Sequence, residues 1–250
     1  MGKAVDYALE AADKSINRSA FREASTFLRE ALRGFEHLPQ TTEIVEKAID
    51  VRLRLRVAET GARGGLKKIR VELEKAADMA RSIGDKERMA KTAIHLGFTA
   101  GMLGDTPAAE SQAQLAHNLA LEIRNRYLLV ESRILLAQTC SYAGKPGQIE
   151  SLLLPHMDYL TRDIRHETMG QTMIRAVVAC AHMAIGAAFQ DRSNESAHWE
   201  QEGHAIALES GRPFDLMYMQ FTSGVCLDLR GEFDAATAAH ERSAAIADAN

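Results

Sequence analysis

The sequence is poor in proline, aromatic residues and cysteine, and it has no long hydrophobic run. Only 5 prolines and 6% aromatic residues occur in 250, beside many Ala, Leu, Glu and Arg residues. This composition favours helix, because those residues lose little side-chain freedom there. The 46% of hydrophobic residues is enough for a core and excludes a disordered chain. We therefore expect an ordered, helical protein.

The three cysteines, Cys140, Cys180 and Cys226, lie within apolar helical stretches and form no CxxC pair. An odd number so placed indicates buried, reduced thiols and a cytoplasmic protein. The N-terminus lacks the apolar segment of a signal peptide. The most apolar segment, residues 176–189, is too short to cross a bilayer, which takes about 20 residues. We expect no membrane partner.

Basic residues are not in excess, since the net charge is −4. Domains that bind nucleic acid usually carry a basic footprint. This balance argues against a nucleic-acid partner.

Motifs that carry chemistry are missing as well. His166 and Glu167 begin HETMG, which lacks the second histidine of a zinc-protease helix. The stretch GFTAGMLG, residues 97–104, lacks the Lys and Ser/Thr of a phosphate-binding loop. No Ser, Thr or Cys has an evident base partner. We expect no catalytic residue, no metal and no cofactor, and hence no enzyme; hidden hydrolytic activity is the alternative from the enzyme class.

What the sequence does contain is an internal repeat. Its clearest unit, AIHLGFTAGMLGDTPAAESQAQLA at residues 93–116, has Leu96 and Gly97 in a first helix, a turn at Gly104, and small residues at Ala109 and Ala113 in a second helix. This pattern resembles a tetratricopeptide repeat, in which small residues stand where the two helices of a hairpin cross. A larger side chain there would push the helices apart.

The same frame recurs along the chain. The predicted crossing positions, which are small or aliphatic residues of second helices, are Ala24, Ile69, Ala109, Ile149, Ala197 and Ala236. Their spacing exceeds the usual tetratricopeptide period of about 34 residues. The fifth copy lacks the turn glycine, and DIRHETMGQTM at residues 163–173 replaces the expected connection. The geometry of residues 160–205 is therefore left open.

The alternating stretch VRLRLRV at residues 51–57 has the period of a strand. A second-helix frame follows it, however, and that frame requires a first helix before it. On a helix, Val51, Leu55 and Ala58 share one side, and Leu53 and Val57 form an adjoining ridge. We therefore predict a helix here.

Together these patterns predict an all-α fold: a right-handed superhelical solenoid of about six tetratricopeptide-like hairpins, forming a single domain over residues 1–250. The hairpins are expected at about 4–37, 43–83, 87–125, 127–160, 170–210 and 213–249. The first begins almost at Met1 and the last ends at Asn250, without polar capping helices. The chain is thus expected to be part of a longer protein or to have its ends covered by a partner.

A narrower resemblance concerns the opening, ALEAADKSINRSAFREASTFLREALRGFEHLP followed by AIDVRLRLRVAETG. It is similar to the tetratricopeptide region of large bacterial proteins that combine a class III adenylate or guanylate cyclase domain with a P-loop ATPase. The resemblance is strongest over residues 4–90. It implies a regulatory or interaction role and neither enzymatic activity, because no cyclase or ATPase motif is present.

The resemblance also implies a concave groove lined by the first helix of each hairpin. Carrying over the repeat frame, the expected groove residues are Arg54, Ile94, Phe98, Met102, Ile134, Gln138, Tyr142, His182, Phe189, Tyr218 and Phe221. This mixture of aromatic, methionine and polar side chains is typical of surfaces that bind peptides.

The leading hypothesis is a non-catalytic protein-interaction module, a scaffold or sensor arm of a larger signalling protein. Its groove would bind a protein or peptide segment, or another domain of the same polypeptide. The alternative is a small-molecule sensor that binds its ligand between repeats to control an attached domain. The helical segment 176–189 is the expected place for such a pocket.

Overall fold

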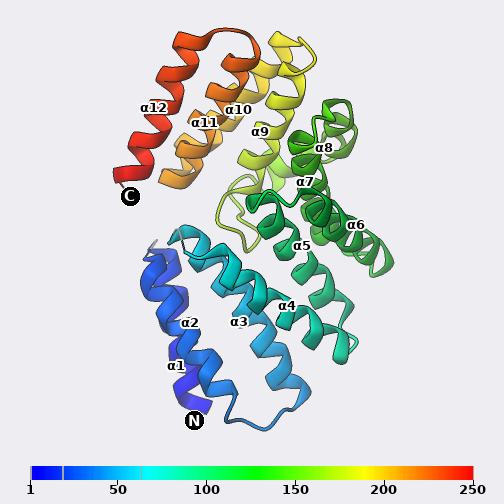
Figure 1. Cartoon of the computed structure of the whole chain (residues 1–250), viewed down its shortest axis with the longest axis vertical. Helices are drawn as coiled ribbons and strands as arrows, with labels where there is room; N and C mark the ends of the chain where they lie inside the picture. The colour runs from blue at the N-terminus through cyan, green and yellow to red at the C-terminus, as the bar shows by residue number, and fades with distance from the viewer. Residues whose placement is uncertain (1, 19, 63, 250) are drawn as a thin grey trace. The chain divides into compact units, whose positions relative to one another are not determined.

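The computed structural model describes residues 2–18, 20–62 and 64–249. These residues form twelve α-helices, a 3-10 turn, a π-helical turn and no strand, which confirms the predicted all-α class (Figure 1). The helices are α1 Gly2–Asn17, α2 Phe21–Phe35, α3 Thr42–Gly61, α4 Leu66–Ser82, α5 Lys86–Met102, α6 Thr106–Glu122, α7 Arg126–Tyr142, α8 Ile149–Asp158, α9 Arg175–Ala188, α10 Ser193–Ser210, α11 Pro213–Leu229 and α12 Phe233–Ala249.

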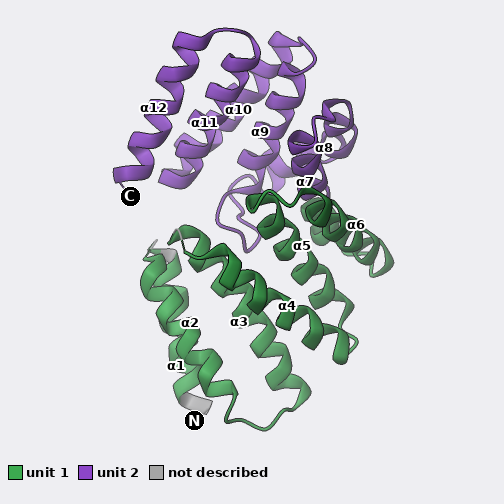
Figure 2. Cartoon of the chain, in the orientation of Figure 1, with its two compact units in different colours: residues 1–132 green, residues 133–250 purple. Residues whose placement is uncertain are grey.

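Two compact units divide the chain, unit 1 over residues 1–132 and unit 2 over residues 133–250 (Figure 2). In unit 1 each helix from α1 to α6 packs against the next, and in unit 2 the same holds from α8 to α12. Helices that follow one another in sequence therefore lie side by side, as expected of helical hairpins joined by short turns.

The predicted helix over VRLRLRV is confirmed as part of α3. Val51, Leu55 and Ala58 are buried in a cluster with side chains of α1 and α2. Leu53, on the adjoining ridge, is buried in a second cluster with side chains of α4. The alternating apolar residues of α3 thus pack against α1 and α2 on one side and against α4 on the other.

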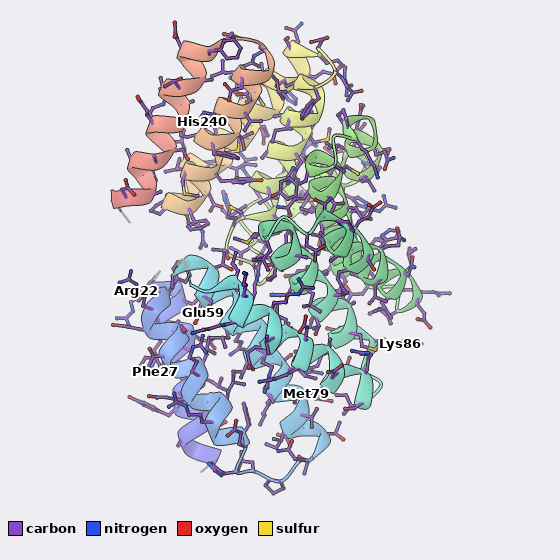
Figure 3. All side chains as sticks on the ribbon, in the orientation of Figure 1. Arg22, Phe27, Glu59, Met79, Lys86 and His240 are labelled. Atoms are coloured by element: carbon purple, nitrogen blue, oxygen red, sulfur yellow. The ribbon has the colours of Figure 1, made fainter. Side chains whose placement is uncertain are left out.

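Polar side chains of α3 form hydrogen bonds and ion pairs with α2 and α4. Glu59, labelled in Figure 3, accepts hydrogen bonds from the Ser25 hydroxyl and from the Arg29 guanidinium of α2. The hydrogen bonds from Ser25 and Arg29, with the charge of Arg29, outweigh burial and hold the pKa of the Glu59 carboxyl below its ordinary value. Arg52 pairs with Glu72 of α4 at 3.2 Å.

The turns repeat with a regular spacing. Left-handed backbone conformations occur at Gly84, Gly104, Arg124 and Gly144, one every 20 residues, and again at Asp191, Gly211 and Gly231 with the same interval. A positive φ favours glycine, because a Cβ crowds the backbone there. Arg124 and Asp191 show that two turns adopt this conformation without glycine.

The residue after the left-handed position caps the next helix in unit 1. The side chains of Asp85, Asp105 and Asn125 each accept a hydrogen bond from the backbone N–H three residues on. The cap of α6 is therefore Asp105. Such a bond satisfies one of the N–H groups left free at a helix start.

Five of the six predicted crossing positions are buried, with Ala24, Ala109 and Ala236 fully enclosed and Ile69 and Ile149 nearly so. The prediction for the remaining position, Ala197, is wrong: this residue is exposed, and Ser196 is buried in its place. Residue 196 lies 40 before Ala236, the same interval that separates Ile69, Ala109 and Ile149. The prediction was one residue out of register.

Close approach of helices in unit 2 explains its small residues. A Cβ built on Gly203 of α10 would lie 2.7 Å from the Met219 side chain of α11 and 3.1 Å from the Cβ of Cys180 in α9. Real Cβ atoms essentially never approach as closely as the first of these. A larger residue at position 203 would therefore require the end of the Met219 side chain to move.

The connection between α8 and α9 is the irregular one that the sequence left open. After α8 the chain makes a π-helical turn at Tyr159–Asp163 and then a loop over residues 164–174. The fully buried Asp215 carboxylate accepts hydrogen bonds from the Ile174 N–H at 2.9 Å and from Arg212 Nε at 3.1 Å. Arg212 also donates to the Thr172 carbonyl. These bonds hold the loop before α9 against the start of α11.

Candidate functional site

The predicted groove residues differ widely in exposure. Ile94, Phe98, Ile134 and His182 are buried, Gln138 and Tyr218 are half-buried, and Arg54, Met102, Tyr142, Phe189 and Phe221 are exposed. Four of the eleven predicted groove residues thus belong to the interior. The repeat frame predicts which way a side chain points, but it does not predict whether another helix covers that side chain.

In unit 1 the predicted residues build no exposed aromatic surface. The guanidinium of Arg56 lies 5.4 Å from the centroid of the buried Phe98 ring, so this ring packs internally and cannot anchor a partner at the surface. Arg54 is exposed but pairs with Asp13 of α1 at 3.2 Å. These contacts join first helices to one another.

Unit 2 does bring several predicted residues together, on α7, α9 and α11. We call this group the His182 cluster; it consists of Gln138, Ser141, Tyr142, His182, Tyr218 and Phe221. Gln138 Nε2 donates to the Tyr142 hydroxyl at 2.8 Å, and Ser141 Oγ lies 3.0 Å from His182 Nδ1. The Tyr218 and Phe221 rings stack with centroids 6.4 Å apart.

The two sides of the cluster are close to each other. Burial, and secondarily the charge of an ionised Tyr142, raises the pKa of Tyr218, which places the tyrosines of α7 and α11 near one another. The Phe221 ring also lies 5.7 Å from that of His240 on α12, which is labelled in Figure 3. The cluster therefore extends from α7 towards the last helix of unit 2.

His182 is the most enclosed member, with 1% of its surface exposed. Burial, and secondarily the charge of Arg175, lowers the pKa of its imidazole to about 3. The ring is therefore neutral at physiological pH. The Ser141 hydroxyl also lies 3.1 Å from the Ala137 carbonyl oxygen, and it has one hydrogen to donate to either acceptor.

The tyrosines of the cluster are also kept neutral. Burial raises the pKa of Tyr142, although the hydrogen bond from Gln138 lowers it, and burial is the largest cause of the raised pKa of Tyr218. Half of Tyr142 is nevertheless exposed. The cluster thus joins exposed aromatic side chains to the buried His182.

The Ser141–His182 pair has the composition of a nucleophile and its base, and sequence reasoning missed it. Serine needs a base of suitable pKa close to neutrality to be activated. An imidazole of pKa about 3 is a weak base at neutral pH. His182 therefore gives the Ser141 hydroxyl little activation as a nucleophile.

Other kinds of site were sought across the described ranges. Within residues 2–18, 20–62 and 64–249 no group of three or more His, Cys, Asp or Glu side chains is placed to hold a metal ion. In the same part of the chain, no helix has both the length and the apolar character needed to cross a membrane. Neither a protein-family model nor a curated protein matches this chain.

Proposed function

We propose that this chain is a non-catalytic interaction module of tetratricopeptide type, a scaffold or sensor arm of a larger bacterial signalling protein such as a cyclase or ATPase. The first helices of unit 2 bind a segment of a protein or another domain of the same polypeptide. One observation carries this proposal: Tyr142, Phe189 and Phe221 are exposed, one on or directly after each of α7, α9 and α11. Aromatic side chains are enriched where proteins bind one another.

Two further elements belong to the same proposal. We propose a right-handed superhelical arrangement of the hairpins. The regular spacing of the turns within each run supports the repeat on which it depends, because equal repeats related by a constant rotation form a solenoid. Three buried cysteines that form no disulfide, Cys140, Cys180 and Cys226, support a reducing, cytoplasmic location.

The experiment compares two matched pairs of exposed side chains. One double variant combines Tyr142→Ala with Phe221→Ala on the first helices. The other combines Leu208→Ala with Phe233→Ala on second helices, where both residues are 67% exposed. Proteins captured from lysate of the source organism by the wild-type chain are identified, and each one is purified and titrated against all three chains.

We expect the first double variant to lose at least about tenfold in affinity for a direct partner, because truncating aromatic anchors removes much of the binding energy. The second should bind as the wild type does. Equal affinities for all three chains, or a larger loss in the second variant, would contradict the proposed surface. The melting temperature of each variant shows whether a loss of affinity reflects the binding surface or a loss of folding.

A second function is supported by a different observation. In the His182 cluster, buried polar atoms lack hydrogen-bond partners among the described residues, namely His182 Nε2 and Gln138 Oε1. Such groups are normally satisfied by protein, water or ligand. A small-molecule sensor would use them, and a metabolite library that raises the melting temperature without any added protein tests this function, since a ligand that binds the folded state stabilises it.

A further inference from the structure

The last hairpin, α11 and α12, exposes side chains whose counterparts in the hairpin before it are covered (Figure 1). The repeat is 40 residues here, so Ala181 and Ile185 of α9 correspond to Phe221 and Val225 of α11. Ala181 is fully buried, and Ile185 is buried in a cluster against which Val225 packs. Phe221, in contrast, is 46% exposed, and Val225 is half-buried. One side of α11 is therefore open to solvent where α9 is covered.

The same comparison holds for the second helices α10 and α12. His204 of α10 faces the next first helix, because its Nε2 lies 3.0 Å from Ser223 Oγ of α11. Its counterpart on α12, 40 residues on, is the exposed Ala244. The Phe221 ring lies 5.7 Å from that of His240, so the open sides of α11 and α12 adjoin. We call this surface the end face; it consists of Tyr218, Phe221, Val225, His240 and Ala244.

A helix occupies the corresponding position earlier in the chain. In unit 1, α3 follows the hairpin of α1 and α2, and it buries Val51, Leu55 and Ala58 against these two helices. Apolar residues at spacings of four and three form one face of an amphipathic helix. The repeat therefore predicts that the end face accommodates a helix with apolar side chains at this spacing.

Carboxylates border the end face. Asp228 Oδ2 lies 3.0 Å from His240 Nε2, and Glu241 is exposed directly after His240. Exposed carboxylates of the last hairpin and the turn within it are Asp228, Glu232, Asp234, Glu241 and Asp248. Only two arginines accompany them in residues 213–249, and both Arg230 and Arg242 donate hydrogen bonds to other side chains of the protein. Such a surface attracts a positively charged partner.

Pairing of this sense already occurs between hairpins. At three junctions, an arginine on or directly after a first helix pairs with a carboxylate of the preceding hairpin: Arg54–Asp13, Arg88–Asp50 and Arg230–Glu200. The pair of Glu59 with Arg29 has the opposite sense. Since carboxylates predominate on the last hairpin, a helix that packs there is expected to contribute the basic side chains.

A second copy of this chain fits the end face poorly. Its α1 is the helix that would start a new hairpin there. Asp6 and Glu10 of α1 stand at the same distances before the crossing residue of their hairpin as Val51 and Leu55 of α3. Both acidic residues are exposed. The α1 helix would thus bring carboxylates to a surface that carboxylates already border, and like charges in contact disfavour a complex.

We propose that the end face binds a basic, amphipathic helix of a partner protein. The apolar side chains of this helix pack against Phe221 and Ala244, and its Arg or Lys side chains pair with carboxylates such as Asp228 and Glu241. The end face shares Phe221 with the surface proposed above, but it extends onto α12 and does not include Tyr142. The inference therefore goes beyond the binding of a segment by first helices.

The test selects helices from a displayed peptide library, with the full chain as bait. Each peptide is about five helical turns long, with Leu fixed at i, i+4, i+7 and i+11 and with Arg, Glu, Gln or Ser at equal frequency elsewhere. Parallel selections use Ala244→Arg and its matched control Ala235→Arg. Ala235 is also exposed on α12, on the opposite side of the helix. Enriched peptides are synthesised and titrated against each chain.

We expect the wild-type chain to enrich peptides that contain Arg more often than Glu. Their affinity for Ala244→Arg should be at least about tenfold lower, because a large cationic side chain then stands on the end face. Ala235→Arg and Tyr142→Ala should bind as the wild type does. The double variant Asp228→Asn, Glu241→Gln should lose at least about threefold, and this difference should shrink at high salt.

Failure to enrich any peptide, equal Arg and Glu contents, or unchanged binding to Ala244→Arg would overturn the proposal. Peptides that lose affinity for Tyr142→Ala but not for Ala244→Arg would bind the first-helix surface instead, so the two surfaces fail separately. Sedimentation velocity tests the second copy: a dimer that Ala244→Arg dissociates would also overturn the proposal. Melting temperatures are measured first, and if Ala244→Arg is destabilised, the double variant of Asp228 and Glu241 decides.

Discussion

Unit 1 and unit 2 share a frame of helices and regularly spaced turns, and each contains polar contacts that differ in exposure. In unit 1, the ion pairs Arg54–Asp13 and Arg88–Asp50 connect first helices and remain in contact with water. Arg54 and Asp13 are about half exposed, and Arg88 pairs with Asp50 at 2.9 Å while also bonding its neighbour Asp85. Such ion pairs connect one hairpin to the next, and their formation removes little water from the charged groups.

In unit 2, the polar contacts of Asp215 and His182 are buried instead. Asp215 is fully enclosed and His182 nearly so, and the partners of these groups include a backbone N–H and a serine hydroxyl. A buried polar group depends on its few partners, because water cannot replace them. One repeat frame can therefore carry both exposed ion pairs and enclosed polar contacts, and the two kinds should respond differently to mutation.

The largest effect is expected for Asp215→Ala. This change removes the acceptor of the Ile174 N–H and the partner of Arg212, so the loop before α9 loses its clamp. We expect the free energy of unfolding to fall by about 2–3 kcal/mol, measured by urea denaturation.

Asp215→Asn is the matched control, because its carbonyl oxygen can still accept from Ile174. The free energy of unfolding of Asp215→Asn should fall by about half as much as that of Asp215→Ala. If Asp215→Ala were as stable as the wild type, the loop would be held by other contacts, and the contrast between buried and exposed polar groups would fail.

His182 should make stability depend on pH. Its pKa is 6.5 for the ordinary side chain and about 3 in the folded protein, because burial and the charge of Arg175 disfavour the imidazolium. Between these values the unfolded chain binds a proton that the folded chain does not, so stability falls as the pH is lowered. From pH 7 to pH 5 this group should remove about 2 kcal/mol.

The measurement compares urea denaturation of wild type and His182→Gln at both pH values. The variant retains a polar side chain without a titrating group, so its loss over this range should be smaller by about 2 kcal/mol. An identical pH dependence of the two proteins would show that His182 is solvated in solution.

Much of the fold could be predicted because it depends on local periodicity. The buried residues of α3 lie on the two ridges that the spacing predicts, and turn glycines such as Gly104 and Gly231 lie where helices end. The errors arise where local signals are weak. Asp191 takes the left-handed position without glycine, so the turn before α10 gave no clear boundary, and Ser196 was passed over for the neighbouring alanine.

The candidate site was harder to predict than the fold. Tyr142 and His182 could be assigned to first helices from the repeat frame, but the contact between His182 and Ser141 joins residues 41 positions apart. No local pattern marks such a pair. Likewise, Phe98 looked like an anchor in sequence because periodicity indicates the face of a helix and does not show whether another element encloses it.

A smaller effect is expected at the helix caps that distinguish unit 1. Asp105→Ala removes the side-chain acceptor of the Ala108 N–H and should lower the free energy of unfolding by about 1 kcal/mol. Asp105→Asn keeps an acceptor and should lower the free energy of unfolding by only about a few tenths of a kcal/mol. Equal losses in the two variants would assign the effect to the ion pair with Arg70.

The smallest effect should come from the Arg54–Asp13 pair, in which both side chains are about half exposed. The coupling free energy, obtained from Arg54→Ala, Asp13→Ala and the double variant, should be below about 0.5 kcal/mol, since water solvates both charges when they separate. It should decrease further at high salt, because ions screen exposed charges. A coupling above about 1 kcal/mol that persists at high salt would mean that the pair is shielded from solvent, and unit 1 would then resemble unit 2 in depending on enclosed polar contacts.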